Sequence, residues 1–592
     1  MKKVYKNKFK IRIWILIILF ISVVIISLCW HYFKINLHHK NSPINKAIDR
    51  EVKNLVLQSS DSLYHISYNT LDINIDSGYG TITGLKVHAD PVVYSKLSKE
   101  YKAPDVLIDA EINNIHLSHI KVLRDGQNQV IDIGEIKLDT PGLKIIVKHL
   151  QHDSATAILT SRFYLFKAVS DLLRMQHYGI FIHQAILKNL DVEYINNNGS
   201  KRSTKLKGLD MQLGAIQFNN DPDSDHNRFF SSINLDNYRI TLPGNIYFVD
   251  LKGVQYNQEK NSIFIHSITL LPRLSKLNFN NSTDKANERY HLVLRNSLIE
   301  HLDVKKWSYD QRIHIPQITS EYGWADIFTN YNAVLHTPPL RRHAYPIDQL
   351  KNLAFDLTID KLNVKDGDVY HTIVAQRSGR EAILSLRHLK ATFDNITNDK
   401  LRIRTDNYMT ANISAMILDA GKVNVSYKFN LKDKSAPFAL HAILGSIDGP
   451  VLNSLLEPLA LIEIKSGRFE KMDAFINADE YHATGNVDMF YKGLKVNLLK
   501  PDKTNGDLKS RPILSFLANS ILPNDNPNAN GKFRKGPVNI IRQPRESFLG
   551  FTWKALLDGM SSAIIGTNQI KNKPKNIVTK LGKLFSGRKK RK

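Results

Sequence analysis

The chain has 592 residues and a formal net charge of +25 at pH 7. Its hydrophobic content of 42% and aromatic content of 9% exclude global disorder, and its length favours two or more folding units or one elongated repetitive body. The only cysteine, Cys29, lies in an apolar run, which excludes a disulfide framework and a multi-cysteine metal site within one chain.

Basic residues are concentrated at the two ends of the chain. Six of them lie in residues 1–12, and ten lie in residues 571–592, where there is no acidic residue. Because both clusters flank apolar segments, contact with anionic lipid headgroups is a simpler interpretation than nucleic-acid binding. We therefore predict membrane lipids as partners and no nucleic acid.

Residues 13–33 predict a transmembrane helix. The eighteen residues that begin at Ile13 contain nothing more polar than serine, and a helix of that length, roughly 27 Å, matches the hydrocarbon core of a bilayer. Trp14 and Trp30 lie near its ends, where aromatic belts occur. Because no small-x-small cleavage site follows, we expect an uncleaved anchor with residues 1–12 in the cytoplasm.

The next segments change from a helical to a strand pattern. Residues 34–60 carry apolar residues at three- and four-residue spacing and predict a juxtamembrane helix. Leu71 to Val87 has the pattern of a hairpin around a turn at Asp76-Ser77-Gly78. From Val106 to Val147 apolar and polar residues alternate with a period of two, and the phase slips at Asn113-Asn114 and Gly134. This predicts strands with one buried and one solvated face, joined by turns or interrupted by bulges.

The same alternation returns as far as residue 510 and predicts a mainly β fold. We expect an elongated, folded-over antiparallel β-sheet that forms a β-groove, with a few short helices. One of these helices is predicted at residues 163–175, packed against the sheet. The pattern breaks near Thr337 and His343, so we assign residues 61–340 to one β segment and residues 341–510 to a second.

Residues 511–570 have a helical character and precede the basic tail at 571–592. From Arg545 to Ile565 one predicted helix face carries five apolar residues. These membrane-surface candidates are Leu549, Trp553, Leu556, Met560 and Ile564. Either this helix lies on a membrane surface, or it covers the open end of a sheet whose edge would otherwise be exposed. The sequence leaves both interpretations open.

The apolar face of the predicted sheet also has two interpretations. If no second layer fills it, it offers a continuous surface to acyl chains, which gain about 0.8 kcal/mol for each buried methylene group. If it is filled, it is the core of ordinary β-sandwiches. The residues that would contact lipid in the first case are Ile73, Ile108, Ile112, Ile131, Ile133, Val487, Met489 and Val496.

The sequence contains none of the common catalytic motifs. There is no Gly-x-Ser-x-Gly elbow, no His-Glu-x-x-His, no P-loop and no Gly-x-Gly-x-x-Gly loop. His38 and His39 follow the predicted anchor, where interfacial polar residues are common, so we predict no metal and no cofactor. Glu321 and Asp326, on either side of Trp324, resemble part of a glycoside-hydrolysing site, but nothing fixes their separation. We expect a protein that is not an enzyme.

Three segments carry a resemblance to a known family. They are the N-terminal MKKVYKNKFKIRIWILIILF, hairpins such as VLIDAEINNIHLSHIKVL, and a C-terminal part that runs from Ile462 to Met560. The C-terminal part includes IEIKSGRFEKMDAFINADEYHATGNVDMFYKGLKVNLL, RPILSFLANSILPNDNPN and RESFLGFTWKALLDGM. With these segments the chain resembles the AsmA-like family of bacterial envelope proteins, relatives of TamB and of other bridge-like lipid-transfer proteins.

The resemblance implies a single-pass anchor in the bacterial inner membrane, with the bulk of the chain in the periplasm. It implies a β-groove with a role in phospholipid transport or in outer-membrane lipid homeostasis and envelope assembly, and no catalytic residues. This chain is short for a bridge between two membranes. Two alternatives remain: a non-enzymatic scaffold for the assembly of envelope proteins, and a membrane-anchored enzyme that acts on glycans.

Overall fold

The fold is known from a computed structural model that describes residues 50–565. The longer gaps within that range are 148–177, 197–201, 219–230, 242–245, 283–287, 301–311, 332–349, 352–355 and 503–506, besides a few shorter ones. The predicted anchor, the helix at 163–175 and the basic tail lie outside the described residues. Of the predicted helix at 34–60, residue 50, residues 53–54 and residues 56–58 are described, and they are helical. No helix in the described ranges is both long and apolar enough to cross a membrane.

The protein is mainly β, as predicted, and it divides into two compact units. Unit 1 comprises Met1–Ile240 and Leu251–Phe264, and unit 2 comprises Thr241–Asp250 and Ile265–Lys592. The division lies earlier in the chain than the predicted boundary near residue 340. The reason is that the strand before residue 340 pairs in parallel with the two strands after it. A break in the alternation therefore marks a crossover connection inside one sheet rather than the end of a domain.

In unit 1 most of the described pairs of neighbouring strands are antiparallel. The exceptions are β5 and β6, which both pair with β7 in parallel. Its elements are β1 (Tyr64–Ser67), β2 (Thr70–Asn74), β3 (Tyr79–Ala89), α3 (Pro91–Lys99), β4 (Val106–Asp125), β5 (Asn128–Asp139), β6 (Gly142–Val147), β7 (Tyr178–Asn196), β8 (Arg202–Leu213), β9 (Ile216–Phe218) and most of β10 (Ser232–Thr241). The hairpin predicted over Leu71 to Val87 is confirmed as the pair β2 and β3.

Backbone irregularities in unit 1 lie at one level across neighbouring strands. Gly84 in β3, Thr140 between β5 and β6, Asn189 in β7 and Gly208 in β8 all have positive φ. The pairing of β3 with β4 skips Asn113 at the same level. The phase slip at Asn113 thus coincides with an interruption of the pairing that leaves the register unchanged, and it belongs to a line of backbone irregularities across neighbouring strands.

Unit 2 contains the remaining strands and most of the helices in the part of the chain that the structure describes. Strands β11 (Tyr247–Asn257) and β12 (Ser262–Pro272) contribute residues to each unit. The other strands are β13 (Arg289–Glu300), β14 (Arg312–Asn330), β15 (Asp356–Val364), β16 (Gly367–Val374), β17 (Glu381–Thr397), β18 (Tyr408–Ile417), β19 (Gly421–Asn430), β20 (Phe438–Leu444), β21 (Ile447–Asp448), β22 (Ile462–Ala478), β23 (His482–Pro501), β24 (Leu508–Ser510) and β25 (Lys535–Ile541). The helices are α6 (Lys276–Ser282), α9 (Lys400–Thr405), the 3-10 helix η1 (Gly449–Leu452), α10 (Asn453–Ala460), α11 (Pro512–Ile521) and α12 (Phe548–Ile565).

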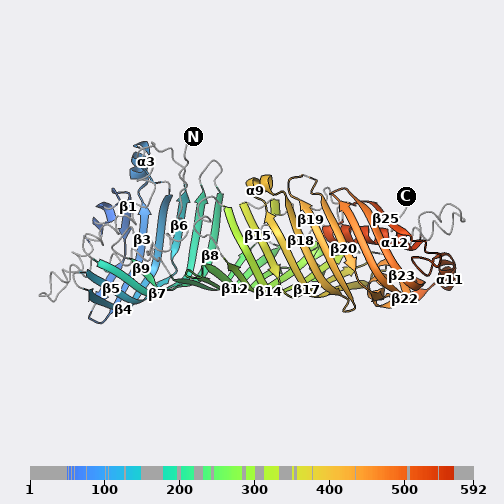
Figure 1. The fold of residues 1–592 in the computed structure, drawn as a ribbon. Helices are drawn as coiled ribbons and strands as arrows, with labels where there is room; N and C mark the ends of the chain where they lie inside the picture. The colour runs from blue at the N-terminus through green and yellow to red at the C-terminus, as the bar shows by residue number, and fades with distance from the viewer. Residues whose placement is uncertain are drawn as a thin grey trace. The chain divides into compact units, whose positions relative to one another are not determined.

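The C-terminal part of unit 2 holds the principal core of that unit. Buried side chains of β18 to β25 form one cluster with Phe551, Ala555 and Ala563 of α12. Figure 1 shows α12 running behind the strands β20 to β25. The helix predicted over Arg545 to Ile565 is confirmed as α12, and the helical character predicted from residue 511 onward also includes α11.

Candidate functional site

The candidates for lipid contact in unit 1 lie in a closely packed layer. Ile108 is 4% exposed, Ile112 is 2% exposed, and Ile131 and Ile133 are inaccessible to solvent. In the register of the sheet, Ile133 pairs with Ile120 of β4 on one side and with an isoleucine of β7 on the other. These side chains therefore contact one another, and their burial favours a packing role. Only Ile73, on β2, is half-buried.

The three C-terminal candidates are also closed to solvent. Val487, Met489 and Val496 on β23 are between 0% and 6% exposed. Val487 lies under α12, since a side chain on Gly559 of that helix would collide with it. Lipid contact at all these positions remains a prediction, and the structure directs attention to the parts of the same face that are open.

Unit 2 has an apolar face built from side chains in register across its strands. One set, the Phe393 row, consists of Ile299, Ile318, Leu362, Phe393, Ala411, Tyr427, Leu440 and Ile476. A second set, the Ile413 row, consists of Val364, Ala391, Ile413, Val425, Ala442, Ala474 and Val487. Cross-strand neighbours of this kind point to one side of the sheet.

The apolar face differs in accessibility along its length. On β14, β15, β17 and β18 the side chains of Ile318, Leu362, Phe393 and Ile413 are half-buried. From β20 onward the same rows are closed, with Leu440 and Ile476 each 1% exposed. The larger side chains of the two rows are thus half-buried on these four strands, beside the buried smaller side chains of Val364, Ala391 and Ala411, and the rows are closed from β20 onward.

The cover over the closed part is α12. Phe548 at its start packs against the rings of Tyr427, Phe429 and Phe438, with ring centroids 5.1 to 5.7 Å apart. Further along, Gly559 approaches Gly536 of β25 so closely that a side chain on Gly536 would meet the Gly559 carbonyl oxygen at 2.1 Å. The helix therefore lies directly on the sheet.

The membrane-surface candidates of α12 take part in this packing. Leu549, Trp553, Leu556, Met560 and Ile564 are all half-buried, and the last three of them contact the core cluster of unit 2. Of the two interpretations from the sequence, this arrangement favours a helix that covers the sheet.

A buried carboxylate holds the N-terminus of α12. Glu288, just before β13, is 6% exposed, and its two oxygens accept hydrogen bonds from the hydroxyls of Ser547 and Tyr290. The Gly550 backbone N–H also donates to it, and burial, the largest influence, raises the pKa of Glu288. Burial likewise raises the pKa of Tyr331, whose hydroxyl packs against Gly550. One helix thus contacts the beginning of β13 and, further along, β25.

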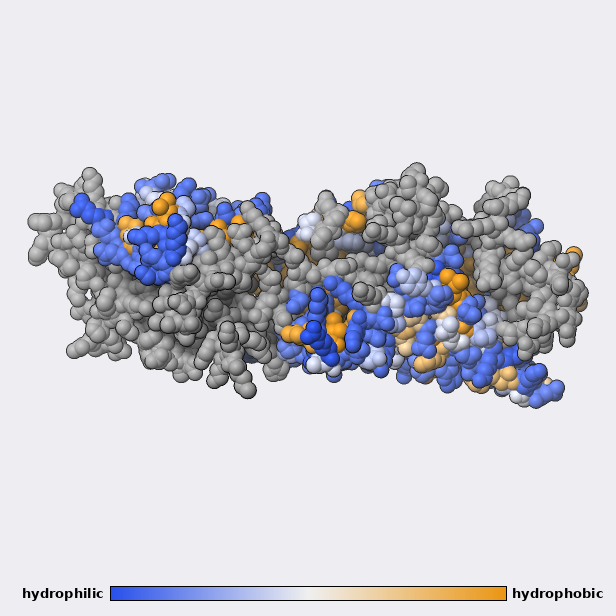
Figure 2. Space-filling view, turned by 90° about the horizontal axis from the view of Figure 1, so that it is seen from above, coloured by the Kyte–Doolittle hydropathy of each residue, from blue (hydrophilic) through white to orange (hydrophobic). Residues whose placement is uncertain are grey.

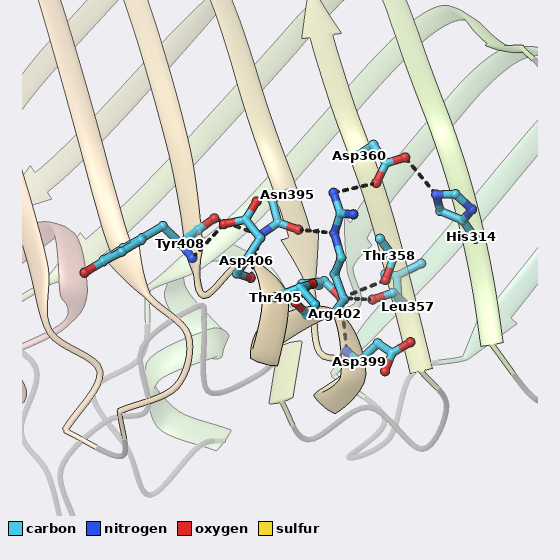
Figure 3. A network of polar contacts seen from close by, with 11 residues as sticks. His314, Leu357, Thr358, Asp360, Asn395, Asp399, Arg402, Thr405, Asp406 and Tyr408 are labelled. Atoms are coloured by element: carbon cyan, nitrogen blue, oxygen red, sulfur yellow. Dashed lines mark hydrogen bonds and ion pairs between the residues drawn. The ribbon is translucent and has the colours of Figure 1, made fainter.

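A polar network supports the strands at one border of the open apolar stretch (Figure 3). The Asp360 carboxylate lies 2.7 Å from His314 Nε2 and 3.3 Å from the Arg402 guanidinium of α9. Arg402 Nε donates to the side-chain oxygen of Asn395, whose amide nitrogen donates to the Tyr408 carbonyl at 2.8 Å. Asn395 has a φ of 57°, a conformation that asparagine tolerates better than most residues. These contacts fix a bend in β17 and the position of α9.

The opposite face of the same strands is polar. Asn363, Thr392, Asn412 and Ser426 are in register there, and the Thr392 and Ser426 hydroxyls donate to the two asparagine side chains. A shallow depression of about 660 Å³ on these strands is lined by residues of this polar set and also by Val364, Ala391, Ile413 and Val425. The strands are therefore amphipathic, with adjacent residues on opposite faces.

The carboxylates that suggested glycoside chemistry are held by separate cations. Glu321 binds Lys365 at 2.6 Å, and Asp326 binds Lys276 at 3.0 Å and Arg289 at 3.7 Å. The two carboxylates thus have different partners and are not held in one shared site by these contacts. They serve the sheet as structural ion pairs.

The most perturbed histidine in the described ranges is His371. Burial lowers its pKa to about 4, and its Nε2 lies 2.8 Å from the Thr329 hydroxyl. The imidazole is therefore neutral at neutral pH and bonded inside the sheet. This arrangement suits packing rather than proton transfer to a substrate.

Sequence reasoning missed the residues that position α12. Glu288 and Ser547 are 259 positions apart, and no local pattern links them. Gly536 and Gly559 carried a weak signal, since glycine inside a strand or a helix often marks a close approach of backbones.

No protein-family model matches the chain, and no curated protein matches it significantly.

Proposed function

We propose that the protein is an envelope protein anchored in the bacterial inner membrane, and that it shelters phospholipid acyl chains on the apolar face of unit 2. The observation that supports this most strongly is the half-buried stretch formed by Ile318, Leu362, Phe393 and Ile413. The proposal retains the role in lipid homeostasis that the sequence resemblance implies, with the bulk of the chain in the periplasm.

The size of the open stretch suits part of an acyl chain. It extends over four neighbouring strands, so its three interstrand spacings amount to about 14 Å. An acyl chain laid along it gains about 0.8 kcal/mol for each methylene group that leaves water. No charged side chain belongs to either the Phe393 row or the Ile413 row.

The position of α12 supports the same proposal. The helix occupies the apolar rows on the strands next to the open stretch, so this face accepts a long apolar object. The helix contacts Glu288, just before β13, and also Gly536 on β25. These two contacts favour a sheet that curves around the helix. In our proposal acyl chains occupy the part of the face that α12 leaves free.

One observation favours a second function, that of a scaffold for envelope assembly. The apolar layer of unit 1 is filled by its own side chains, of which Ile131 and Ile133 are inaccessible. A scaffold requires only such a rigid body. The two functions are compatible if unit 1 is a support and unit 2 is the lipid-handling part.

The proposal predicts that Ile413→Asp reduces lipid contact with unit 2. A charge in the open stretch must be desolvated when an acyl chain lies over it. The full chain, extracted without detergent in a polymer-bounded disc, is incubated with a photoreactive phospholipid, and lipid adducts on unit 2 peptides are counted by mass spectrometry. We expect at least a fivefold loss of adducts, which corresponds to about 1 kcal/mol.

The matched control is Asn412→Asp, which adds the same charge on the neighbouring residue of the polar face. It is expected to leave the adducts unchanged. Equal labelling of the original chain and both variants, or no adducts on unit 2 of any of them, would refute the proposal.

A further inference from the structure

Helix α11 exposes two large apolar side chains next to each other. Ile513 is 78% exposed and Phe516 is 73% exposed, and residues three apart lie on the same side of a helix. The face of the molecule in Figure 2 is mostly hydrophilic where it is coloured, with hydrophobic atoms in small separate patches. The two side chains together form a small exposed apolar surface on one helix.

Helix α11 is attached to the sheet by Leu514 and Ala518, which pack in the core of unit 2, and by polar side chains. Ser515 Oγ accepts a hydrogen bond from the Leu498 N–H at 2.9 Å. The Asn519 side chain accepts from the Val496 N–H and donates to the Val496 carbonyl, at 2.9 and 2.8 Å. These bonds satisfy an edge of β23 and fix the orientation of the helix. Ile513 and Phe516 are thus held outward by a rigid attachment.

Basic side chains lie beside this apolar pair. Lys500 of β23 is directly opposite Lys509 of β24, and Arg511 immediately precedes the helix. Lys509 binds Asp502, whereas Lys500 has no ion pair within the described ranges. Lys500 and Arg511 therefore offer positive charge beside α11 that an anionic partner would complement.

We propose that this surface, made of Ile513, Phe516, Lys500, Lys509 and Arg511, docks onto an anionic bilayer. Ile513 and Phe516 enter the interface between headgroups and acyl chains, and the three basic residues contact the headgroups. Apolar residues beside basic residues are the combination by which interfacial helices bind membranes. This docking goes beyond the shelter of acyl chains in unit 2 and does not depend on it.

The test uses a fluorophore that reports the environment of α11 alone. An environment-sensitive dye is attached at Ser520→Cys in a Cys29→Ser background, with the full chain held in a nanodisc. Separate vesicles of phosphatidylcholine, with or without phosphatidylglycerol, are then added. We expect a blue shift of the emission with the anionic vesicles, and a loss of that shift at high salt because surface charges are screened. The same dye at Lys422→Cys, on β19, should show no shift.

Two variants decide whether α11 itself carries the docking. The double variant Ile513→Ser, Phe516→Ser is expected to raise the vesicle concentration that gives half of the maximal shift at least tenfold. Leu277→Ser, which removes an apolar side chain that is 83% exposed on α6, should change nothing. A shift that survives the double variant, or no shift with any vesicle, would overturn the docking proposal. Either outcome leaves the adduct count on unit 2 as a separate test of the proposed function.

Discussion

Gly536→Ala is expected to destabilise unit 2 by about 3 kcal/mol and to detach α12 from the sheet. A methyl group at this position would lie 2.1 Å from the Gly559 carbonyl oxygen and 2.6 Å from the Val487 carbonyl oxygen. Both atoms belong to the backbone, so the collision is relieved only if the helix or the strand moves. Hydrogen exchange on the full chain should show α12 amides losing protection, and the thermal midpoint of unit 2 should fall.

Two further alanine variants calibrate this result. Gly559→Ala places its methyl group 2.3 Å from a methyl group of Val487, and a side chain moves more easily than backbone, so a smaller loss is expected. Gly445→Ala has its nearest neighbour at 3.4 Å and should be close to neutral. If Gly536→Ala behaves like Gly445→Ala, α12 does not lie on the sheet as described.

Glu288→Ala is expected to cost about 3 kcal/mol in the free energy of unfolding, at the upper end of the cost of unsatisfied buried polar groups. Its removal leaves the Ser547 and Tyr290 hydroxyls and the Gly550 N–H without their shared acceptor. The start of α12 would lose its link to β13. Urea unfolding monitored by tryptophan fluorescence measures the loss, since Trp553 lies on α12.

Glu288 also predicts a pH dependence whose direction follows from its raised pKa. The folded protein binds this proton more tightly than the unfolded chain does, so the stabilisation is fully present below the ordinary pKa of 4.5. It is lost as the pH rises from there through the pKa of the folded state. Glu288→Gln, which is neutral at every pH, should remove this part of the pH profile. An unchanged profile in the Gln variant would contradict the assignment.

The local elements of this fold could be predicted because their causes are local. The alternation from Val106 to Val147 is that of half-buried strands, and its slips at Asn113 and Gly134 are interruptions of the strand pairing in the structure. At the second slip, a side chain on Gly134 would collide with His119, which has a positive φ of 56°. The apolar spacing after Arg545 likewise located α12.

The contacts between distant segments could not be predicted. A periodic pattern indicates that a side chain is buried, but it does not identify the segment that covers it. Ile133 and Ile413 both belong to strands with the same alternation, yet the first is inaccessible and the second is half-buried. The difference depends on which segment covers each sheet. The break near Thr337 is a second example. The strand before it pairs in parallel with the two strands after it, and parallel pairing across a crossover leaves no local signal in the sequence.

The most direct test of the lipid proposal compares neighbouring residues on opposite faces of β17. A photo-crosslinking amino acid replaces Phe393 on the apolar face, Thr392 on the polar face, or Ile133 in the packed layer of unit 1. After irradiation of intact cells, mass spectrometry identifies what each position has captured. We predict phospholipid adducts at position 393 and none at positions 392 and 133. Protein adducts alone at position 393, or the same lipid adducts at all three positions, would contradict the account.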